Sequence, residues 1–284
     1  MPRLFTRRNF LRGAAAGTLG VCGGAAYVHW GEPHWLKLQR YTIPTLQRDR
    51  PRLRVLHLSD FHASLDVSLE FIAEAIALGL AEKPDLIAVT GDFFTNRLYH
   101  RAADYVEVLR ALPAAAPTFA CFGNHDGGPW TRRGGGYSTV AEAQSLLKEA
   151  NIRFLLNEFV ELTVCERPLQ IFGTGDLWSG MCFPQRAFAN APARGTATRL
   201  VLNHNPDAKD SLRPFDWDLV LCGHTHGGQC RLPFFGTPFA PVRDQRYVEG
   251  LHAWEDRWLF VTRGVGNLHG VRFNCRPEVS VLDI

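Results

Sequence analysis

Residues 53–62 read Leu-Arg-Val-Leu-His-Leu-Ser-Asp-Phe-His, a β-rich run that ends in an aspartate and a histidine. Short runs of this kind recur along the chain, and polar, glycine-containing turns follow them. They predict eight strands, at residues 53–59, 85–90, 118–122, 169–174, 199–203, 219–222, 258–262 and 278–283. Eight strands are too many for one small sheet.

Helical patterns lie between the early strands, at residues 68–81, 102–112 and 140–150. The first places five apolar side chains on one face: Phe71, Ile72, Ala75, Ile76 and Leu80. Strands that alternate with helices predict an α/β fold, in which loops at the carboxyl ends of strands carry the chemistry. No repeat, low-complexity tract or linker follows Arg40, so we expect one catalytic domain.

Side chains that bind metals follow five of the predicted strands directly. They are Asp60 and His62 after the first, Asp92 after the second, Asn124 after the third, His204 after the fifth, and His224 and His226 after the sixth. Because such strand ends face one crevice, we expect the seven side chains to converge. Seven ligands are too many for one metal and instead predict two ions that share a bridging carboxylate.

The spacing of these groups supports the same interpretation. Asp60 to Asp92 and Asp92 to Asn124 each span 32 residues, which is room for one β-α-β crossover. Three glycines next to the ligands allow tight turns that bring the ligands close: Gly91, Gly123 and Gly223.

In chain order the motifs are Asp-x-His, Gly-Asp, Gly-Asn-His-Asp, a single His and Gly-His-x-His. This order resembles the signature of the calcineurin-like metallophosphoesterases, from about Leu53 to the C-terminus. The resemblance implies an α/β four-layer sandwich of two packed β-sheets flanked by helices. It also implies the metal ligands: one ion would be held by Asp60, His62 and His226, the other by Asn124, His204 and His224, with Asp92 as the bridge.

The resemblance further implies a mechanism for hydrolysis of phosphate esters. A hydroxide bridging the two ions would attack phosphorus in line with the leaving oxygen. His125 would approach the phosphate and the leaving-group oxygen, and Asp126 would orient it. The ligand types admit Mn, Fe, Zn, Co or Ni, and we expect Mn to support activity in vitro.

Finer features narrow the group within this family. Purple acid phosphatases carry a tyrosine where this chain has Thr95, so a tyrosinate-iron enzyme is not expected. Four segments resemble the twin-arginine-exported bacterial phosphodiesterases of the YaeI/YkuE type: residues 205–207 (Asn-Pro-Asp), 223–229 (Gly-His-Thr-His-Gly-Gly-Gln), 263–266 (Arg-Gly-Val-Gly) and 272–274 (Arg-Phe-Asn). Arg263 and Arg272 have two open interpretations, contact with a substrate phosphate or structural ion pairing and loop packing. Asp176, in a further Gly-Asp pair, is expected to be structural.

Three functions follow from this pattern. The first is a binuclear metal-dependent phosphodiesterase. The second is a UDP-2,3-diacylglucosamine pyrophosphatase of lipid A metabolism, which would need a groove for acyl chains and would act on a lipid-linked pyrophosphate. The third is a metal-binding interaction module without catalysis, and the complete ligand set argues against it.

The charge of the chain argues against a nucleic-acid partner. The formal net charge is +3, but Arg3, Arg7, Arg8 and Arg12 lie in the first twelve residues. Subtracting these four charges leaves −1 for the remainder. Proteins that hold a long nucleic-acid backbone usually carry a strongly basic domain.

The seven cysteines form no Cys-x-x-Cys pair. Several lie in apolar runs, so we expect buried free thiols more than disulfides. A protein that folds before export would also meet the reducing cytosol first.

The first 28 residues have the pattern of a targeting segment. Residues 6–12 (Thr-Arg-Arg-Asn-Phe-Leu-Arg) resemble the twin-arginine consensus, and a weakly apolar run rich in Ala and Gly follows at residues 13–28. That run is short for a bilayer span, which needs about 20 apolar residues. A cleaved signal and a retained membrane anchor both stay open.

These features divide the chain into three parts. We expect a signal or anchor at 1–28, a juxtamembrane segment at 29–50 and the metallophosphoesterase domain at 51–284. Export through the Tat translocon would deliver the protein to the periplasm or to the periplasmic face of the inner membrane. The aromatic residues Trp30 and Trp35 have two open interpretations, contact with a membrane surface and ordinary packing.

Overall fold

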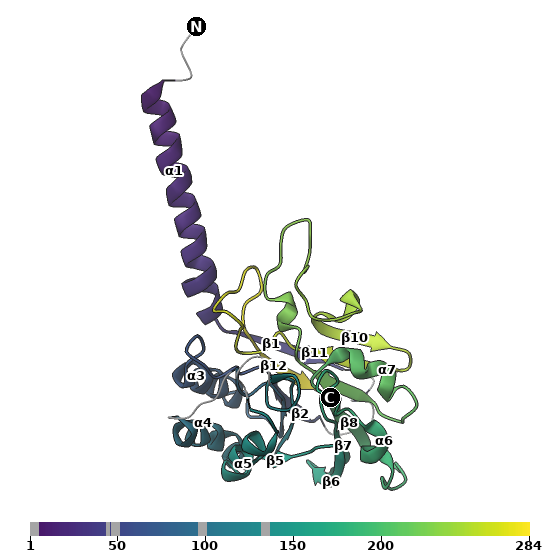
Figure 1. Ribbon diagram of the computed structural model, residues 1–284. Helices are drawn as coiled ribbons and strands as arrows, with labels where there is room; N and C mark the ends of the chain where they lie inside the picture. The colour runs from purple at the N-terminus through teal and green to yellow at the C-terminus, as the bar shows by residue number, and fades with distance from the viewer. Residues whose placement is uncertain (1–5, 44–45, 47–51, 96–100, 132–136) are drawn as a thin grey trace.

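The computed structural model describes residues 6–43, 46, 52–95, 101–131 and 137–284. They form two mixed six-stranded sheets (Figure 1). The first sheet has the order β1 (Lys37–Thr42), β12 (Glu278–Asp283), β2 (Arg54–Leu58), β3 (Leu86–Thr90), β4 (Thr118–Cys121) and β5 (Arg153–Phe154). The second has the order β10 (Gly250–Trp254), β11 (Arg257–Val261), β9 (Leu219–Cys222), β8 (Thr198–Leu202), β7 (Arg167–Gly173) and β6 (Glu158–Val164).

The strands that lead into the expected site run in parallel. β2, β3 and β4 are neighbours in one sheet, and β8 and β9 are neighbours in the other. The pairs β12 with β2, β10 with β11 and β6 with β7 are antiparallel. Parallel strands end at the same edge of a sheet, so each sheet presents one row of loops.

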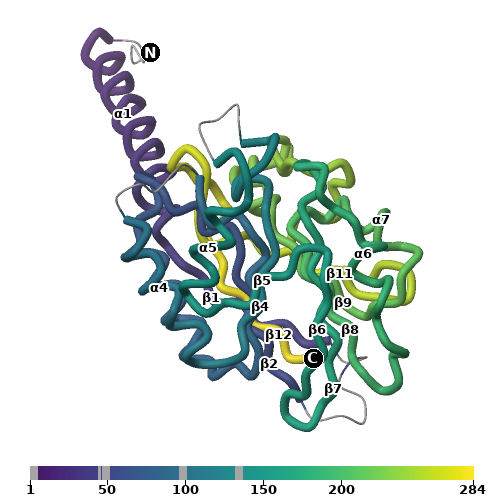
Figure 2. Tube along the Cα trace, turned by 60° about the horizontal axis from the view of Figure 1, so that its bottom comes forward, coloured from purple at the N-terminus to yellow at the C-terminus, as the bar shows by residue number. Residues whose placement is uncertain are grey.

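Helices cover the outer faces of both sheets. They are α3 (Leu69–Leu80), α4 (Ala102–Ala115) and α5 (Ala141–Glu149) on the first sheet, and the short α6 (Pro184–Phe188) and α7 (Lys209–Leu212) beside the second. Figure 2 shows α4 and α5 on one side of the paired sheets and α6 and α7 on the other. Shorter helical turns occur at Tyr27–Gly31, Glu32–His34, Pro206–Ala208, His226–Gly228 and Gln245–Tyr247.

Successive side chains of the central strands point alternately toward the other sheet and toward the helices. In β2, Val55 packs between the sheets against Leu200 and Phe260 of the second sheet. Its neighbour Leu56 points the other way and joins the cluster under the helices, with Ile72 of α3. Successive side chains of a strand point to opposite faces, so a fully apolar strand is buried on both. The expected four-layer sandwich is confirmed.

The strands that the sequence misses are β1, β5, β6 and β10. Each of them is the edge strand of its sheet. The burial of β6 alternates between partly buried and exposed residues, and β5 has only two residues, so neither contains the continuous apolar run of an interior strand.

The N-terminal helix α1 (Arg7–Ala26) projects away from the sheets and has no buried residue (Figure 1). Across the stretches that the structure describes, no helix is both long and apolar enough to cross a membrane. The segment that follows α1 belongs to the folded body, because β1 pairs with β12 over residues 37–42. Glu32 is also buried, and its carboxylate accepts hydrogen bonds from the amides of Asn274 and Cys275. The body therefore begins before the boundary expected at residue 51.

Candidate metal centre

The loops after β2, β3 and β4 meet the loops after β8 and β9. Within the first sheet the loops are joined by backbone hydrogen bonds, from the Asp60 amide to the Gly91 carbonyl and from the His62 amide to the Asp92 carbonyl, both 2.9 Å. The second sheet joins them through the His224 amide, which lies 3.1 Å from each carboxylate oxygen of Asp60. The loops that carry the expected ligands thus meet across the ends of both sheets.

Five of the expected ligands have an unusual backbone conformation. They have φ between 48° and 70° and are Asp60, His62, Asp92, His224 and His226. Residues other than glycine rarely adopt the left-handed region, and such residues cluster at functional sites. The tertiary structure therefore holds these side chains in place against the preference of their own backbone.

Two glycines let the ligands approach the neighbouring loops. A Cβ at Gly223 would lie 2.2 Å from Oδ2 of Asp60, and a Cβ at Gly123 would lie 2.0 Å from Oδ1 of Asp92. No side chain fits at those distances. The close approach expected from the glycines is confirmed at both positions.

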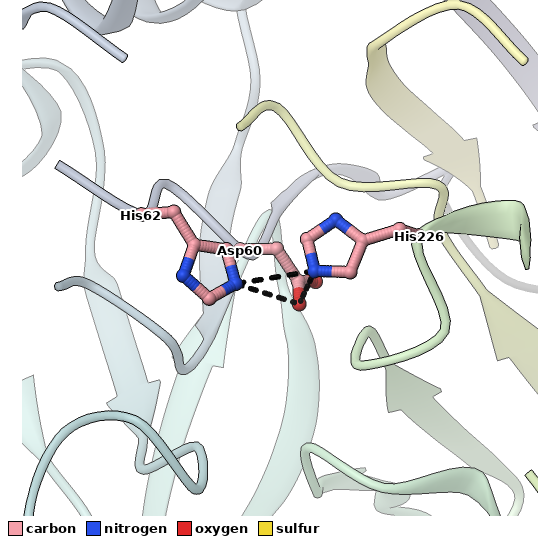
Figure 3. Close-up of side chains that lie close together, drawn as sticks. All are labelled: Asp60, His62 and His226. Carbon is pink, nitrogen blue, oxygen red and sulfur yellow. Dashed lines mark hydrogen bonds and ion pairs between the residues drawn. The ribbon is translucent and has the colours of Figure 1, made fainter. Parts of the chain in front are cut away.

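The first ligand cluster consists of Asp60, His62 and His226 (Figure 3). Nε2 of His62 lies 3.1 Å from Nε2 of His226, and Nε2 of His226 lies 3.4 Å from Oδ1 of Asp60. The two histidines thus direct ring nitrogens toward the same carboxylate. Ligand atoms about 2 Å from a shared ion are separated by similar distances.

The second cluster consists of Asp60, Asp92 and His204. Oδ2 of Asp92 lies 3.2 Å from Nε2 of His204 and 3.3 Å from Nε2 of His62, so Asp92 stands between the two clusters. Nδ1 of His224 faces Nε2 of His204 at 3.2 Å. The buried Oδ1 of Asn124 has no hydrogen-bond partner among the described atoms. A buried amide oxygen without a donor fits a metal ligand.

Hydrogen bonds from outside the clusters fix two of the imidazoles. Nδ1 of His204 donates to the carbonyl of Thr90 at 2.7 Å, and Nδ1 of His62 lies 3.0 Å from the hydroxyl of Thr95. The Thr95 hydroxyl donates to the carbonyl of His62 at 3.3 Å, so it accepts from that Nδ1. In both rings Nε2 is left as the lone-pair donor, which is the arrangement that metal-binding histidines need.

The electrostatics of the clusters also fit cations. Burial raises the pKa of Asp60, because its charged form is costly away from water. Burial would lower the pKa of His204, but Asp92 and Asp60 beside it raise that pKa to about 10. The carboxylates therefore attract positive charge. Two aspartates, an amide oxygen and imidazoles form a donor set suited to divalent transition metals.

His125 lies at the edge of the clusters. Its amide donates to Oδ1 of Asp92 at 2.8 Å, and its ring packs edge-on against His62 with 4.9 Å between ring centroids. Burial lowers the pKa of His125 to about 4. The imidazole is therefore neutral near pH 7 and carries one N–H that can donate to a substrate oxygen.

The carboxylate of Asp126 contacts backbone amides of the loops that carry the ligands. It accepts hydrogen bonds from the amides of Asp92, Phe93 and Gly123, at 2.8, 2.6 and 2.8 Å. None of the hydrogen bonds found in the described part of the chain joins it to the His125 ring. Asp126 thus shapes the loop that carries Asp92, and its role in orienting His125 stays a prediction.

The two arginines with open interpretations have structural partners. Arg272 is fully buried and donates to five backbone carbonyls, including those of Gly266 and Cys275. Arg263 lies within 4 Å of the carboxylates of Glu249 and Glu278. The structural interpretation fits Arg272, because its donors are used within the fold, and the ion pairs of Arg263 agree with the same interpretation.

The sequence did not mark the residues that support the ligands. Thr90 supplies a backbone carbonyl, which no side-chain pattern can reveal, and in the sequence Thr95 is notable only as a position without tyrosine. Asp176 is buried and accepts from the Ser179 amide at 2.6 Å, in line with a structural role. All seven cysteines are free, and Cys121, Cys222 and Cys275 are buried.

Comparison with known proteins agrees with this geometry. Residues 53–228 match the sequence profile described as calcineurin-like phosphoesterase. The chain is 44% identical to "Phosphodiesterase YaeI" of Escherichia coli (strain K12) over 282 residues, which are 99% of this chain and 100% of that protein. It is 31% identical to "Uncharacterized metallophosphoesterase YkuE" of Bacillus subtilis (strain 168), over 98% of this chain and 97% of that protein.

The chain is also similar to more distant proteins. The chain is 26% identical to "UDP-2,3-diacylglucosamine pyrophosphatase LpxG" of Chlamydia muridarum, over 88% of this chain and 90% of that protein. Among solved structures, the 5'-nucleotidase precursor of Thermus thermophilus aligns with a TM-score of 0.50 and 14% identity. That alignment covers 82% of this chain and 55% of the nucleotidase, and it supports the fold alone.

Proposed function

The chain belongs to the calcineurin-like phosphoesterase family, and on that premise we propose that it is a metal-dependent phosphodiesterase. The observation that carries the proposal is the convergence of buried carboxylates and imidazoles around Asp92, which stands 3.2 and 3.3 Å from histidines of both clusters. The relative at 44% identity carries the name phosphodiesterase, which supports the same activity.

We propose that the ligands divide as the family resemblance implies. Asp60, His62 and His226 would hold one ion, Asn124, His204 and His224 the other, and Asp92 would bridge them. Two bound divalent ions would neutralise the phosphate oxygens and activate water as the nucleophile. Mn is the proposed ion for activity in vitro, with Fe, Zn, Co and Ni as the alternatives.

His125 would act directly on the substrate by donating a hydrogen bond. Its ring lies against His62 and is neutral near pH 7, so its N–H can donate to the phosphate or to the leaving oxygen. Asp126 acts one step further away, because it holds the backbone that carries Asp92.

The experiment uses the purified full-length protein loaded with Mn. It compares hydrolysis of bis(4-nitrophenyl) phosphate, 4-nitrophenyl phosphate and UDP-2,3-diacylglucosamine, with Asp92→Ala as the control. Preference for the diester, lost in the variant, supports the proposal, and preference for the monoester contradicts it. Silence on all three with metal bound would favour the non-catalytic module.

A second candidate function is a lipid-linked pyrophosphatase, favoured by a specific pocket. A cavity of about 400 Å³ adjoins His226 and is lined mainly by apolar side chains, among them Phe239, Leu268 and Val271. Ligand pockets commonly have this size and character. One relative is named for UDP-2,3-diacylglucosamine, whose acyl chains would suit such a cavity. A higher kcat/KM for that nucleotide lipid than for the aryl diester would favour this candidate.

We also propose export through the Tat translocon to the periplasm or the periplasmic face of the inner membrane. Helix α1 begins directly after Thr6, whose hydroxyl accepts from the Asn9 amide, and the helix buries nothing against the body. The translocon and a membrane surface could therefore engage α1 without disturbing the fold.

Substitution of the arginine pair tests this proposal. The double variant Arg7→Lys with Arg8→Lys should stay in the cytoplasm, whereas Arg12→Lys, which the consensus tolerates, should be exported. Cell fractionation with immunoblotting measures both. Export of the double variant at the normal level would contradict the proposal.

A further inference from the structure

Two tryptophans stand half exposed beside the metal centre. Trp130 is 45% and Trp178 37% exposed, and their ring centroids lie 4.7 Å apart with the planes tilted by 48°. The Trp178 ring also meets the His224 ring at right angles, with 4.3 Å between centroids. The pair therefore forms an aromatic ledge next to an expected metal ligand.

The loop that carries Trp178 is held in place by side chains. The amide nitrogen of Asn157 donates to the Met181 carbonyl at 3.0 Å, and its oxygen accepts from the amides of Gly175 and Phe183 at 3.1 and 2.9 Å. These bonds fix the loop on both sides of the tryptophan. Its exposure is thus not a sign of loose backbone.

The loop that carries Trp130 is closed in a similar way. The Gly128 amide donates to the Tyr137 carbonyl at 3.3 Å, and the Thr131 hydroxyl donates to the Gly128 carbonyl at 3.0 Å. Trp130 follows β4 of the first sheet, and Trp178 follows β7 of the second. Residues 128–131 and 175–183, which follow strands of different sheets, therefore bring the indoles together.

Packing within the fold does not account for this pair. Trp217 and Trp254 are buried and stack on each other in the core, with 5.6 Å between ring centroids. Trp130 and Trp178 instead leave ring surface in contact with water. Exposed aromatic faces on ordered loops beside a reaction centre are suited to holding a ligand.

We propose that Trp130 and Trp178 form a stacking platform for a planar aromatic ring, such as a nucleobase, in the substituent of a phosphodiester substrate. This rests on the proposed function, since the metal centre would hold the phosphate beside the ledge. Indole faces stack on planar rings whatever the base, whereas a hydrocarbon chain would find its apolar surroundings in the cavity at His226.

Two esters with the same leaving group test the platform. Thymidine 5'-(4-nitrophenyl) phosphate carries a nucleobase, and methyl 4-nitrophenyl phosphate carries none. Trp178→Ala and Trp130→Ala should each raise KM for the thymidine ester about 5- to 150-fold, the range for loss of one base stack, and leave kcat nearly unchanged. For the methyl ester the change should stay below about twofold.

Two further variants sharpen the result. Trp178→Phe keeps an aromatic face and should recover most of the loss. Trp30→Ala removes an indole that is 71% exposed on the segment after α1, and it should change neither ester. An equal effect of Trp178→Ala on both esters, or no effect on either, would overturn the platform.

A binding measurement separates this proposal from the catalytic one. By titration calorimetry, the Mn-loaded protein should bind thymidine 5'-monophosphate more tightly than 2-deoxyribose 5-phosphate, and Trp178→Ala should remove the difference. Equal affinities in the unchanged protein would overturn the platform, because the sugar phosphate alone would then explain binding. Base-dependent binding without turnover of any ester would keep the platform and overturn the proposed activity.

Discussion

The two sheets contribute different chemistry to the metal centre. Loops of the first sheet carry all of the expected oxygen ligands: Asp60, Asp92 and Asn124. Loops of the second sheet carry only imidazoles: His204, His224 and His226. The carboxylates among the expected ligands therefore belong to one sheet, and the other sheet supplies only imidazoles to the expected set.

The difference extends to how the loops are held. The first-sheet loops are joined to each other by backbone hydrogen bonds and by the carboxylate of Asp126. The second-sheet loop reaches them through the amide of His224, which faces the carboxylate of Asp60. Asp60 is thus an expected ligand, and it is also a point at which the loops of the two sheets meet.

The largest expected effect follows from removing the charge between the clusters. Asp92→Asn keeps the size of the side chain but removes its negative charge, so kcat/KM for the aryl diester should fall by about 10³-fold or more. Metal content, measured by atomic emission, should fall as well. Asp256→Asn, at a side chain that is 86% exposed, is the matched control. Normal activity in Asp92→Asn would contradict the division of charge between the sheets.

Loss of one imidazole from the second sheet should have a smaller effect. His204→Ala leaves Asp60, His62 and His226 in place, so the protein should retain about one ion in place of two and lose activity on the order of 10²-fold. His252→Ala is the control, because His252 lies on β10 and bonds a backbone carbonyl at 2.8 Å. A loss as large as that of Asp92→Asn would show that the sheets contribute equally.

A supporting hydrogen bond should matter less again. Thr95→Val removes the hydroxyl that accepts from Nδ1 of His62, so metal affinity should fall about 10- to 100-fold. Thr139→Val is the comparison, because the Thr139 hydroxyl donates to the exposed carboxylate of Glu142 at 2.9 Å. Metal titration measures both variants. Equal affinity in Thr95→Val and the unchanged protein would contradict a role for this bond.

Metal removal should give the smallest effect, on stability. Ions bound by loops of both sheets favour the folded state by about 2.7 kcal/mol at a concentration a hundred times the Kd. Dialysis against a chelator should therefore lower Tm by about 5 to 10 °C, and Mn should restore it. Differential scanning fluorimetry measures the shift. An unchanged Tm would mean that the ions do not join the two sheets.

The interior of both sheets could be predicted from the sequence, whereas the edges could not. β3 is five residues of Leu-Ile-Ala-Val-Thr, all buried, because both of its faces are covered. β1 carries Lys37, Gln39 and Arg40 and is only partly covered. An edge strand exposes much of its surface, so its composition is close to that of a loop.

The positions of the ligands could be predicted for a related reason. A residue that directly follows a strand is placed by the sheet, so the convergence of Asp60, Asp92 and His204 follows from topology. The partners of Asp126 and Arg272 depend on how the loops fold back on themselves. Left-handed turns such as the one at Asp60 decide these partners, and they have no signature in the order of residue types.

Helix α1 and the residues that follow it differ in how much sequence change they tolerate. Residues 7–26 bury nothing, so relatives could lengthen, shorten or exchange this helix without repacking the body. The residues that follow α1 tolerate fewer changes. The carboxylate of Glu32 is buried against the amides of Asn274 and Cys275, and β1 forms an edge of the first sheet. Over evolutionary time the sequence of the helix can therefore change without effect on the folded body, whereas β1 must change together with β12, the strand with which it pairs.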